Sequence, residues 1–125
     1  MEIMDGTVEN IMSKLLLSVD ASAKIGTVSK LMSRSNADIL PVLEDGRLVG
    51  IINEDSLNPN SSDSVRKLMR KPLFVEKNRN VDYCIKYILK HGISRVPVVD
   101  SAIGMKCIGT VSSSQLLKAK KLEKK

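Results

Sequence analysis

A two-stranded hairpin pattern occurs twice in this chain and constrains its fold more than any other feature. The first copy runs from Ile39 to Asn53, and Asp45-Gly46 between its two apolar runs favours the positive φ angles that a tight turn requires. The second copy runs from Arg95 to Ser112 and has a longer loop between its apolar runs. Because one copy with its flanks takes up roughly half the sequence, the chain is predicted to consist of two units of one plan.

The match between the two copies extends in both directions from their prolines, Pro41 and Pro97. Further matching pairs are Gly50 and Gly109, Val8 and Val65, Ile11 and Leu68, Met12 and Met69, Val19 and Val75, Ile25 and Val81, and Leu57 and Leu116. The first repeat is therefore predicted to occupy residues 1–60 and the second residues 61–125.

Apolar periodicity predicts the same order of elements in both repeats. In the first repeat, a short strand from Leu16 to Val19 and a helix from Ile25 precede the hairpin. A second, short helix is expected to begin at Glu54–Leu57, directly after the hairpin, and to end at the polar run Asn58-Pro59-Asn60-Ser61-Ser62, which links the repeats. The order in this repeat is thus strand, helix, strand, strand, helix.

The second repeat carries clearer start and stop signals for its helices. Asn80 can cap a helix that Gly92 ends in the left-handed conformation, and a closing helix is expected from Ser112 to Leu122. Each repeat is therefore a β-α-β-β-α unit, which gives a small three-stranded sheet with helices on one face. The predicted fold class is α/β (α+β), with the two repeats related by a pseudo-twofold axis and burying their apolar sheet faces against each other.

Composition fits one soluble domain's worth of protein. The chain has 125 residues, and a hydrophobic content of 42% is enough for a real core. No apolar run approaches the roughly 20 residues that span a bilayer, and the start, from Met1 to Asp5, lacks the basic and apolar regions of a signal peptide. We therefore expect a cytoplasmic protein that does not engage a membrane.

The sequence shows no constellation that would support catalysis or hold a cofactor. The two cysteines, Cys84 and Cys107, fall on apolar faces, so we expect buried reduced thiols, and the single histidine, His91, makes no zinc-binding pattern with them. There is no nucleophile elbow, no glycine-rich phosphate loop and no pair of carboxylates with a supporting base. We expect neither enzymatic activity nor a metal site.

Charge is distributed unevenly along the sequence. Up to Asn60 there are five Lys and Arg against nine Asp and Glu, whereas the remainder has fifteen against five. A basic second half could attract phosphate or nucleic acid. Both tyrosines, Tyr83 and Tyr87, lie on a predicted helix, so the aromatic platform that usually stacks single-stranded bases is missing. This argues against nucleic-acid binding, which stays an alternative function.

The motifs of the two repeats together resemble the CBS domain. The pattern is Val-x-x-Ile-Met near the start of a unit, a helix, Leu-Pro-Val, Asp-Gly, and Val-Gly-Ile-Ile before a second helix. It covers the chain from about Val8 to Leu117, and two copies in tandem resemble a Bateman module. The resemblance implies a regulatory CBS pair that senses an adenosyl ligand in the cleft between the repeats, such as AMP, ADP, ATP or S-adenosylmethionine. It also implies a homodimer that meets through exposed apolar surface on the helices that begin near Ile25 and Val81.

A ligand would meet the residues that flank each hairpin. A helix start after Asn53 or Ser112 presents backbone N–H groups that suit phosphate or ribose, although either residue could equally be an ordinary N-cap. The resemblance assigns the second repeat's ligand-binding positions to Ser94, Arg95, Pro97, Ser112 and Gln115. Arg95 would supply charge for a phosphate.

The first repeat offers a weaker version of the same site, at Asp38, Asn53, Asp55 and Ser56. An aspartate at position 38 would repel a phosphate. The family usually has an aspartate that holds the ribose hydroxyls where Ser56 and Gln115 stand here. Its absence leaves a ligand-free dimerisation module as another alternative, and an unidentified effector protein as a further partner.

Overall fold

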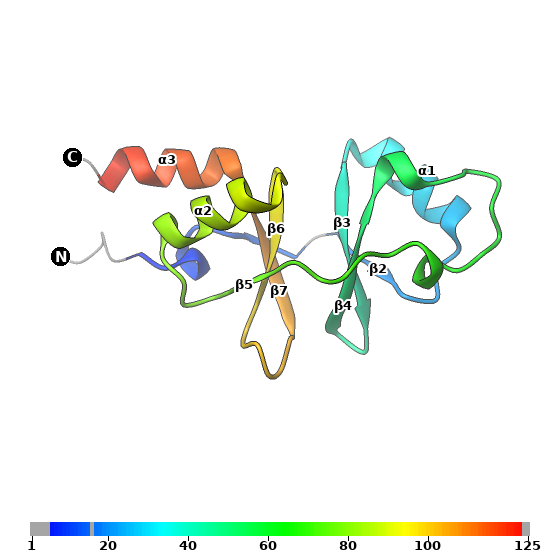
Figure 1. Ribbon diagram of the computed structural model, residues 1–125, viewed down its shortest axis with the longest axis horizontal. Coiled ribbons are helices and arrows are strands. Elements are labelled where there is room, and N and C mark those ends of the chain that lie inside the picture. The colour runs from blue at the N-terminus through cyan, green and yellow to red at the C-terminus, as the bar shows by residue number, and fades with distance from the viewer. Residues whose placement is uncertain (1–5, 16, 124–125) are drawn as a thin grey trace. The chain divides into compact units, whose positions relative to one another are not determined.

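The computed structural model describes residues 6–15 and 17–123, without the side chains of Ser56 and Glu123. The chain forms two compact units, which Figure 1 shows as ribbons. The first-repeat unit is Leu17–Leu73, and the second-repeat unit joins Met1–Leu16 to Phe74–Lys125. The segments that precede the two hairpins in the sequence are therefore exchanged between the units. Residues 6–15 pack with the second repeat, and residues 65–73 pack with the first. We call these two stretches the exchanged segments.

The first-repeat unit is a three-stranded sheet with one helix. Its sheet has the order β2-β3-β4, in which β2 lies parallel to β3, and β3 lies antiparallel to β4. The elements are β2 (Val19–Asp20), α1 (Ile25–Ser35), β3 (Ile39–Glu44) and β4 (Arg47–Asn53). The predicted strand is thus present but begins later than expected, and Leu16 lies outside the described residues.

The hairpin turn of this unit has the predicted geometry. Asp45 and Gly46 both take positive φ angles, 53° and 79°. A side chain at the second position would be strained, which explains glycine there. The local pattern was therefore sufficient to predict this turn.

The second-repeat unit has a four-stranded sheet in the order β1-β7-β6-β5. Its elements are β1 (Ser13–Lys14), β5 (Val75–Glu76), α2 (Val81–His91), β6 (Arg95–Val99), β7 (Cys107–Ser112) and α3 (Ser113–Glu123). Three strands were expected, and the fourth is β1, which pairs antiparallel with β7 through Ser13 opposite Thr110 and Lys14 opposite Gly109. The exchanged chain start supplies this strand.

The predicted signals at the ends of α2 are confirmed. The Oδ1 of Asn80 accepts a hydrogen bond from the Tyr83 backbone N–H at 2.9 Å, and Gly92 ends the helix with φ 63°.

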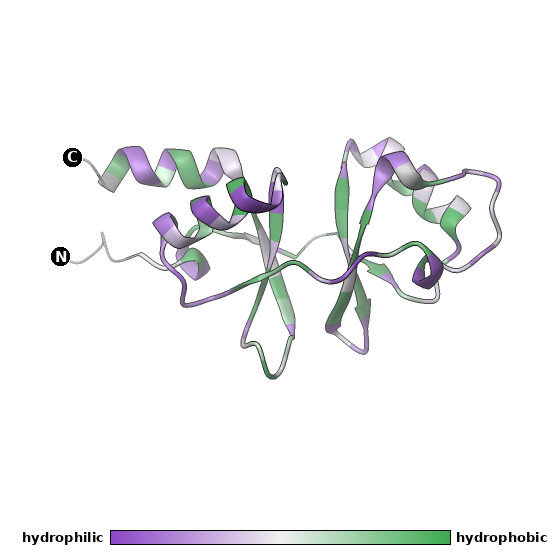
Figure 2. Cartoon of the chain, in the orientation of Figure 1, coloured by the Kyte–Doolittle hydropathy of each residue, from purple (hydrophilic) through white to green (hydrophobic). Residues whose placement is uncertain are grey.

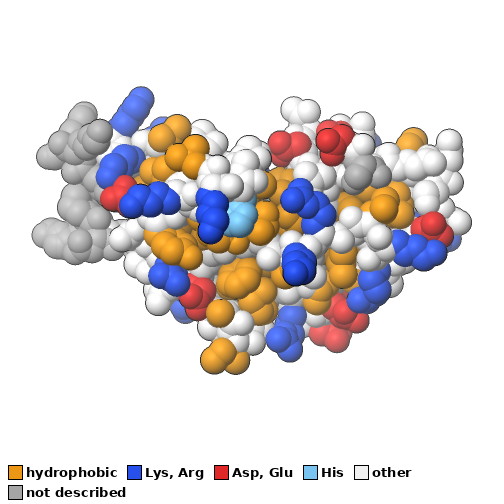
Figure 3. All heavy atoms as spheres, viewed as in Figure 1, with side chains coloured by type: hydrophobic (Ala, Val, Ile, Leu, Met, Phe, Trp, Pro, Cys, Tyr) orange, Lys and Arg blue, Asp and Glu red, His pale blue; other side chains and the backbone are white. Residues whose placement is uncertain are grey.

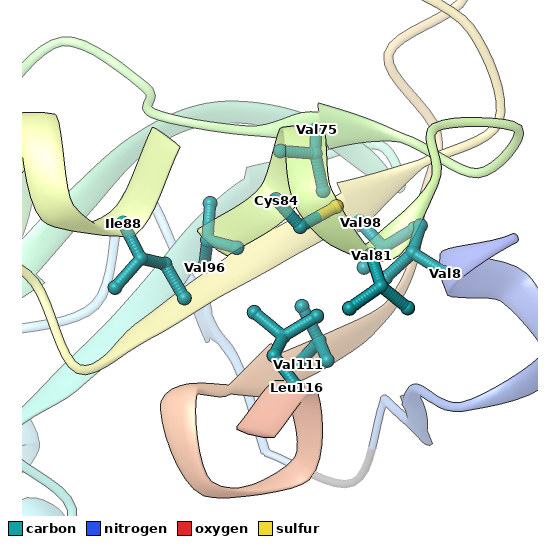
Figure 4. Packing of buried hydrophobic residues seen from close by; sticks show 9 residues of the cluster. All are labelled: Val8, Val75, Val81, Cys84, Ile88, Val96, Val98, Val111 and Leu116. Atoms are coloured by element: carbon teal, nitrogen blue, oxygen red, sulfur yellow. The ribbon is translucent and has the colours of Figure 1, made fainter. Parts of the chain in front are cut away.

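The buried stripe of α2 packs on the sheet with residues of α3 and of the exchanged segment. Figure 4 shows this core, which consists of Val8, Val75, Val81, Cys84, Ile88, Val96, Val98, Val111 and Leu116. Hydrophobic colouring in Figure 2 likewise follows the strands of both sheets.

The exchanged segment of each unit crosses close over the glycine of the hairpin. A Cβ on Gly109 would meet the Ser13 carbonyl oxygen and, at 2.8 Å, the Met12 sulfur. A Cβ on Gly50 would meet the Arg70 carbonyl oxygen and the Met69 sulfur, each at 2.8 Å. The two aligned glycines therefore leave room for a crossing backbone and a methionine.

The helix that was expected to begin at Glu54 is only one 3-10 turn, Glu54–Ser56. Leu57 already has extended backbone, with ψ 130°. Pro59 follows two residues later, and a proline disfavours helical backbone in the residue before it and removes a helix hydrogen bond. The two repeats therefore differ at this point, because α3 has 11 residues.

Two further expectations concern the cysteines and the outer helix surfaces. Cys84 and Cys107 are free and buried, as predicted. Exposed apolar surface was expected on both long helices, but Leu89 of α2 is 74% exposed whereas the described part of α1 has no such residue. No helix among the described residues is both long and apolar enough to cross a membrane.

Candidate functional site

The start of α3 is fixed by a reciprocal pair of side-chain hydrogen bonds. The Ser112 hydroxyl accepts from the Gln115 backbone N–H at 3.2 Å, and the Gln115 Oε1 accepts from the Ser112 backbone N–H at 2.9 Å. This Ser-x-x-Gln arrangement is a capping box, which satisfies two N–H groups that the helix itself leaves without acceptors. Ser112 is thus an N-cap, and its hydroxyl has a fixed position.

The amide nitrogen of Gln115 also connects α3 to the exchanged segment. Its Nε2 donates to the Ile11 carbonyl oxygen at 3.2 Å and to the Ser13 Oγ at 3.0 Å. An amide NH2 has two donors, so both are occupied. A ribose hydroxyl could use Gln115 only in competition with these partners.

Arg95 lies beside this helix start. It is opposite Ser112 in the β6–β7 register, and the Ser94 carbonyl oxygen accepts from the Ser113 backbone N–H at 2.9 Å. The Arg95 side chain is exposed and makes no ion pair within the described part of the chain. The fourth predicted position, Pro97, is buried opposite Thr110. The structure therefore brings Ser94, Arg95, Ser112 and Gln115 together at one strand end.

The unit that contains Arg95 has more basic than acidic residues. Within its unit, the described residues include ten Lys and Arg against five Asp and Glu. The basic cluster from Arg66 to Lys71 belongs to the other unit. There the Arg66 Nη2 lies 3.1 Å from the Glu44 carboxylate, and the Lys67 Nζ lies 3.4 Å from Asp63. The charge contrast between units is therefore smaller than the contrast between sequence halves.

The candidate residues of the first repeat lie at the equivalent strand end of the other unit. Asn53 ends β4 opposite Ile39, and the Asp38 carbonyl oxygen accepts from the Glu54 backbone N–H at 3.0 Å. The side chains of Asp38 and Asp55 are exposed, and Asn53 makes no side-chain cap to the 3-10 turn. Ser56 lies in that turn, and its side chain falls outside the described residues. At this strand end the helix is only a 3-10 turn, and Ile39 stands opposite Asn53 where Arg95 stands opposite Ser112.

The sequence reading did not identify Ile11 and Ser13 as part of the second-repeat site. The capping-box pattern Ser-x-x-Gln at 112–115 was visible in the sequence, but the partners of the Gln115 amide are 104 and 102 residues away. Among the residues that the structure describes, no group of three His, Cys, Asp or Glu could hold a metal ion.

Comparison with known protein families matches the CBS domain model to two stretches of the sequence, residues 8–58 and 65–122. These matches cover most of the chain. The protein belongs to the CBS domain family. It is a CBS pair, with one copy of the domain in each sequence repeat, and the resemblance that the motifs suggested is confirmed.

Solved CBS-pair structures share this fold. CBSX2 from Arabidopsis thaliana is 25% identical, with a TM-score of 0.83, and the alignment covers 95% of this chain and 96% of that chain. A structure of CBSX2 in complex with AMP is also 25% identical, with a TM-score of 0.79 and coverage of 96% and 99%. The mixed α/β fold class predicted from the sequence is thus confirmed.

Curated relatives of this CBS pair are longer than the chain. An uncharacterized protein of Methanocaldococcus jannaschii, MJ0188, is 25% identical over 93% of this chain, which spans 44% of that protein. A homoserine O-acetyltransferase of Methanosphaera stadtmanae is 27% identical over 87% of this chain, which spans 23% of that enzyme. The chain therefore matches less than half the length of these relatives.

Proposed function

We propose that this CBS pair is a regulatory module that binds an adenosyl ligand: AMP, ADP, ATP or S-adenosylmethionine. The ligand's phosphate or other polar end would lie at the second-repeat strand end, where Arg95 supplies charge and Ser94 and Ser112 supply hydroxyl groups. Pro97 would shape the adjacent strand, and Gln115 would hold the Ser112 hydroxyl in place. Binding would change the conformational equilibrium of the module and thereby regulate a partner.

The observation that carries this proposal is the position of Arg95 opposite Ser112 at the start of an 11-residue helix. The N-terminal end of a helix has a positive dipole that favours anions, and a guanidinium adds full charge with directed donors. The AMP complex of CBSX2 supports an adenine nucleotide as the ligand class. At the first repeat, Asp38, Asn53, Asp55 and Ser56 would contribute less, because the exposed carboxylates repel phosphate.

Thermal unfolding in the presence of nucleotides tests this function. AMP, ADP, ATP and S-adenosylmethionine would each be added at millimolar concentration, with inorganic phosphate and adenine as separate controls. We expect at least one adenosyl compound to raise Tm by several degrees, because a ligand at about 100 times its Kd adds roughly 2.7 kcal/mol to stability. If all four leave the melting curve unchanged, the ligand-free dimerisation module replaces this proposal.

We further expect the module to form a homodimer and to act on an effector protein. Longer relatives that include enzymes indicate that a CBS pair of this kind accompanies other protein regions. Closed symmetric dimers are the commonest soluble homo-oligomers. Sedimentation at tens of micromolar protein tests the dimer, and a purely monomeric species would contradict it.

A further inference from the structure

Every hydrogen-bonding position of the Gln115 side chain is occupied within the second-repeat unit. Its Oε1 accepts from the Ser112 backbone N–H at 2.9 Å and from the Ser112 Oγ at 3.2 Å. Its Nε2 donates to the Ile11 carbonyl oxygen at 3.2 Å and to the Ser13 Oγ at 3.0 Å. A side-chain amide has two lone pairs on its oxygen and two N–H donors. A ligand can therefore bond Gln115 only where it displaces one of these partners.

Displacement of these partners would cost more than a sugar hydroxyl returns. Ile11 and Ser13 are half-buried, so an oxygen that loses the Gln115 amide there regains water incompletely. A sugar hydroxyl is already hydrated before it binds, so its hydrogen bond to the protein yields a small net gain. Gln115 should therefore keep its partners when a ligand binds nearby.

The neighbouring polar side chains are not dedicated to a sugar hydroxyl either. Ser94 and Ser114 are exposed, and a neutral hydroxyl in water exchanges one hydrogen bond for another with little net gain. Arg95 offers donors, but a guanidinium binds a phosphate more strongly, because both partners are charged. A site strongly rejects a ligand that lacks a hydroxyl when that ligand leaves a buried polar group of the site unpaired. These three side chains are exposed, so a deoxy sugar leaves none of them in that state.

A carboxylate at position 115 would behave differently. It has acceptor positions alone, so it could not donate to Ile11 or Ser13. It would hold sugar hydroxyls with charge-assisted hydrogen bonds, which are roughly twice as strong as neutral ones. Gln115 therefore has another role, because its amide links α3 to the exchanged segment at residues 6–15 and takes no part in sugar recognition.

We propose that the second-repeat site binds a nucleotide through its phosphate and does not distinguish ribose from 2′-deoxyribose, an inference that rests on the function proposed above. Arg95 stands opposite Ser112 in the β6–β7 register and supplies the charge for the phosphate. Gln115 is a positioning residue that holds the start of α3 and stays bound to the exchanged segment. The ligand class of this site therefore includes deoxyribonucleotides as well as ribonucleotides.

Isothermal titration calorimetry with the full chain tests this inference without any variant. AMP, ADP and ATP would each be compared with the 2′-deoxy counterpart, and adenosine would serve as the control without phosphate. We expect each pair to agree in Kd within about threefold and adenosine to bind at least about tenfold more weakly. A preference for the ribonucleotide beyond about threefold would overturn the inference and leave the proposed function standing. If no nucleotide binds, the inference fails, and the proposed function fails with it unless S-adenosylmethionine binds.

Two variants test whether the nucleotide lies at Arg95. Figure 3 shows Lys and Arg side chains at several places over α2 and α3, so an anion could also be attracted elsewhere on the unit. Arg95→Ala should weaken a ribonucleotide and its deoxy counterpart by the same factor, at least about tenfold, because the lost contact is to phosphate. Lys86→Ala removes another exposed cation, on α2, and should weaken neither. Equal weakening by both variants, or no weakening by Arg95→Ala, would overturn the proposal.

Gln115→Glu supplies the complementary test, because it keeps the size of the side chain and replaces the amide by a carboxylate. The variant should prefer AMP to 2′-deoxy-AMP by at least about fivefold. If the folded variant shows no preference, position 115 does not face the sugar, and the explanation by Gln115 is wrong.

Amide hydrogen exchange of the wild type gives a second readout that needs no variant. Residues 11–14 should exchange at the same rate with AMP or 2′-deoxy-AMP bound, because Gln115 keeps its bonds to Ile11 and Ser13 in both complexes. Faster exchange with AMP alone would show that Gln115 leaves these partners for the ribose, and would overturn the proposal.

Discussion

The side-chain amide of Gln115 donates to the backbone carbonyl oxygen of Ile11, at 3.2 Å and across 104 residues of sequence. The same side chain caps α3 through Ser112. One residue therefore joins the first described segment of the chain to its last helix, next to the residues proposed to bind a ligand.

Replacing Gln115 should destabilise the second-repeat unit. Gln115→Ala removes the acceptor of the Ser112 N–H and both donors to the exchanged segment. We expect the free energy of unfolding to fall by about 1–3 kcal/mol, because partly buried partners lose their hydrogen bonds. Urea denaturation would measure the loss, with the exposed Ser114→Ala as control, for which a change within about 0.5 kcal/mol is expected. Equal stability of both variants would show that the link contributes nothing.

Gly109 should tolerate no side chain. In Gly109→Ala the new Cβ would meet the Ser13 carbonyl oxygen, a backbone atom that cannot rotate away, and the Met12 sulfur at 2.8 Å. Overpacking of this kind costs roughly 1–3 kcal/mol. Combining the change with Met12→Ala should not restore stability, since the clash with the backbone remains. A double variant as stable as Met12→Ala alone would contradict this explanation.

Local features of the fold could be predicted from the sequence, whereas contacts between distant segments could not. The Asp45-Gly46 turn and the two ends of α2 depend on a few neighbouring residues, so local patterns were sufficient. The pairing of β1 with β7 and the contacts of Gln115 join segments about 100 residues apart, and no local pattern encodes them. The short helix expected from Glu54, ended by the polar run that contains Pro59, is a 3-10 turn rather than an α-helix.

The part of the candidate site that depends on the hairpin could be predicted from the sequence, and the part that depends on distant segments could not. The hairpin register places Arg95 opposite Ser112, which follows from aligning the two strands. Gln115 finds its hydrogen-bonding partners in the exchanged segment, which comes before the first hairpin in the sequence but packs in the second-repeat unit. Sequence repeats and packing units are different divisions of this chain.

The cysteines give the protein a predicted sensitivity to alkaline pH. Burial raises the pKa of both the Cys84 and the Cys107 thiol from 9.0 to about 11. A group whose pKa is raised by folding contributes stability that is complete below its unfolded pKa and is lost as pH rises through the folded pKa. Stability should therefore fall between pH 9 and about 11.

Urea denaturation at a series of pH values would measure this dependence. The variant Cys84→Val/Cys107→Val keeps apolar side chains of similar size and should show a flatter fall over the same pH range. The native thiols should also react slowly with a thiol reagent at neutral pH and quickly in urea. Fast reaction of the folded protein would show that the thiols are accessible.

Ligand stabilisation should depend on Arg95 more than on any residue of the first-repeat site. Arg95→Ala removes the cation that stands opposite Ser112 in the β6–β7 register, so the Tm increase produced by the best adenosyl ligand should largely disappear. The unliganded variant should stay within about 0.5 kcal/mol of wild type, because an exposed side chain without an ion pair contributes little to folding.

Two controls distinguish a local role of Arg95 from a general effect of charge. Lys106→Ala removes an exposed cation from the same unit and should leave the ligand's Tm increase intact. Asp38→Ala removes a carboxylate from the equivalent strand end of the first repeat and should leave the increase unchanged or enlarge it. If instead Asp38→Ala abolishes the increase and Arg95→Ala does not, the ligand binds at the first repeat, and the helix start at Ser112 serves only to cap α3.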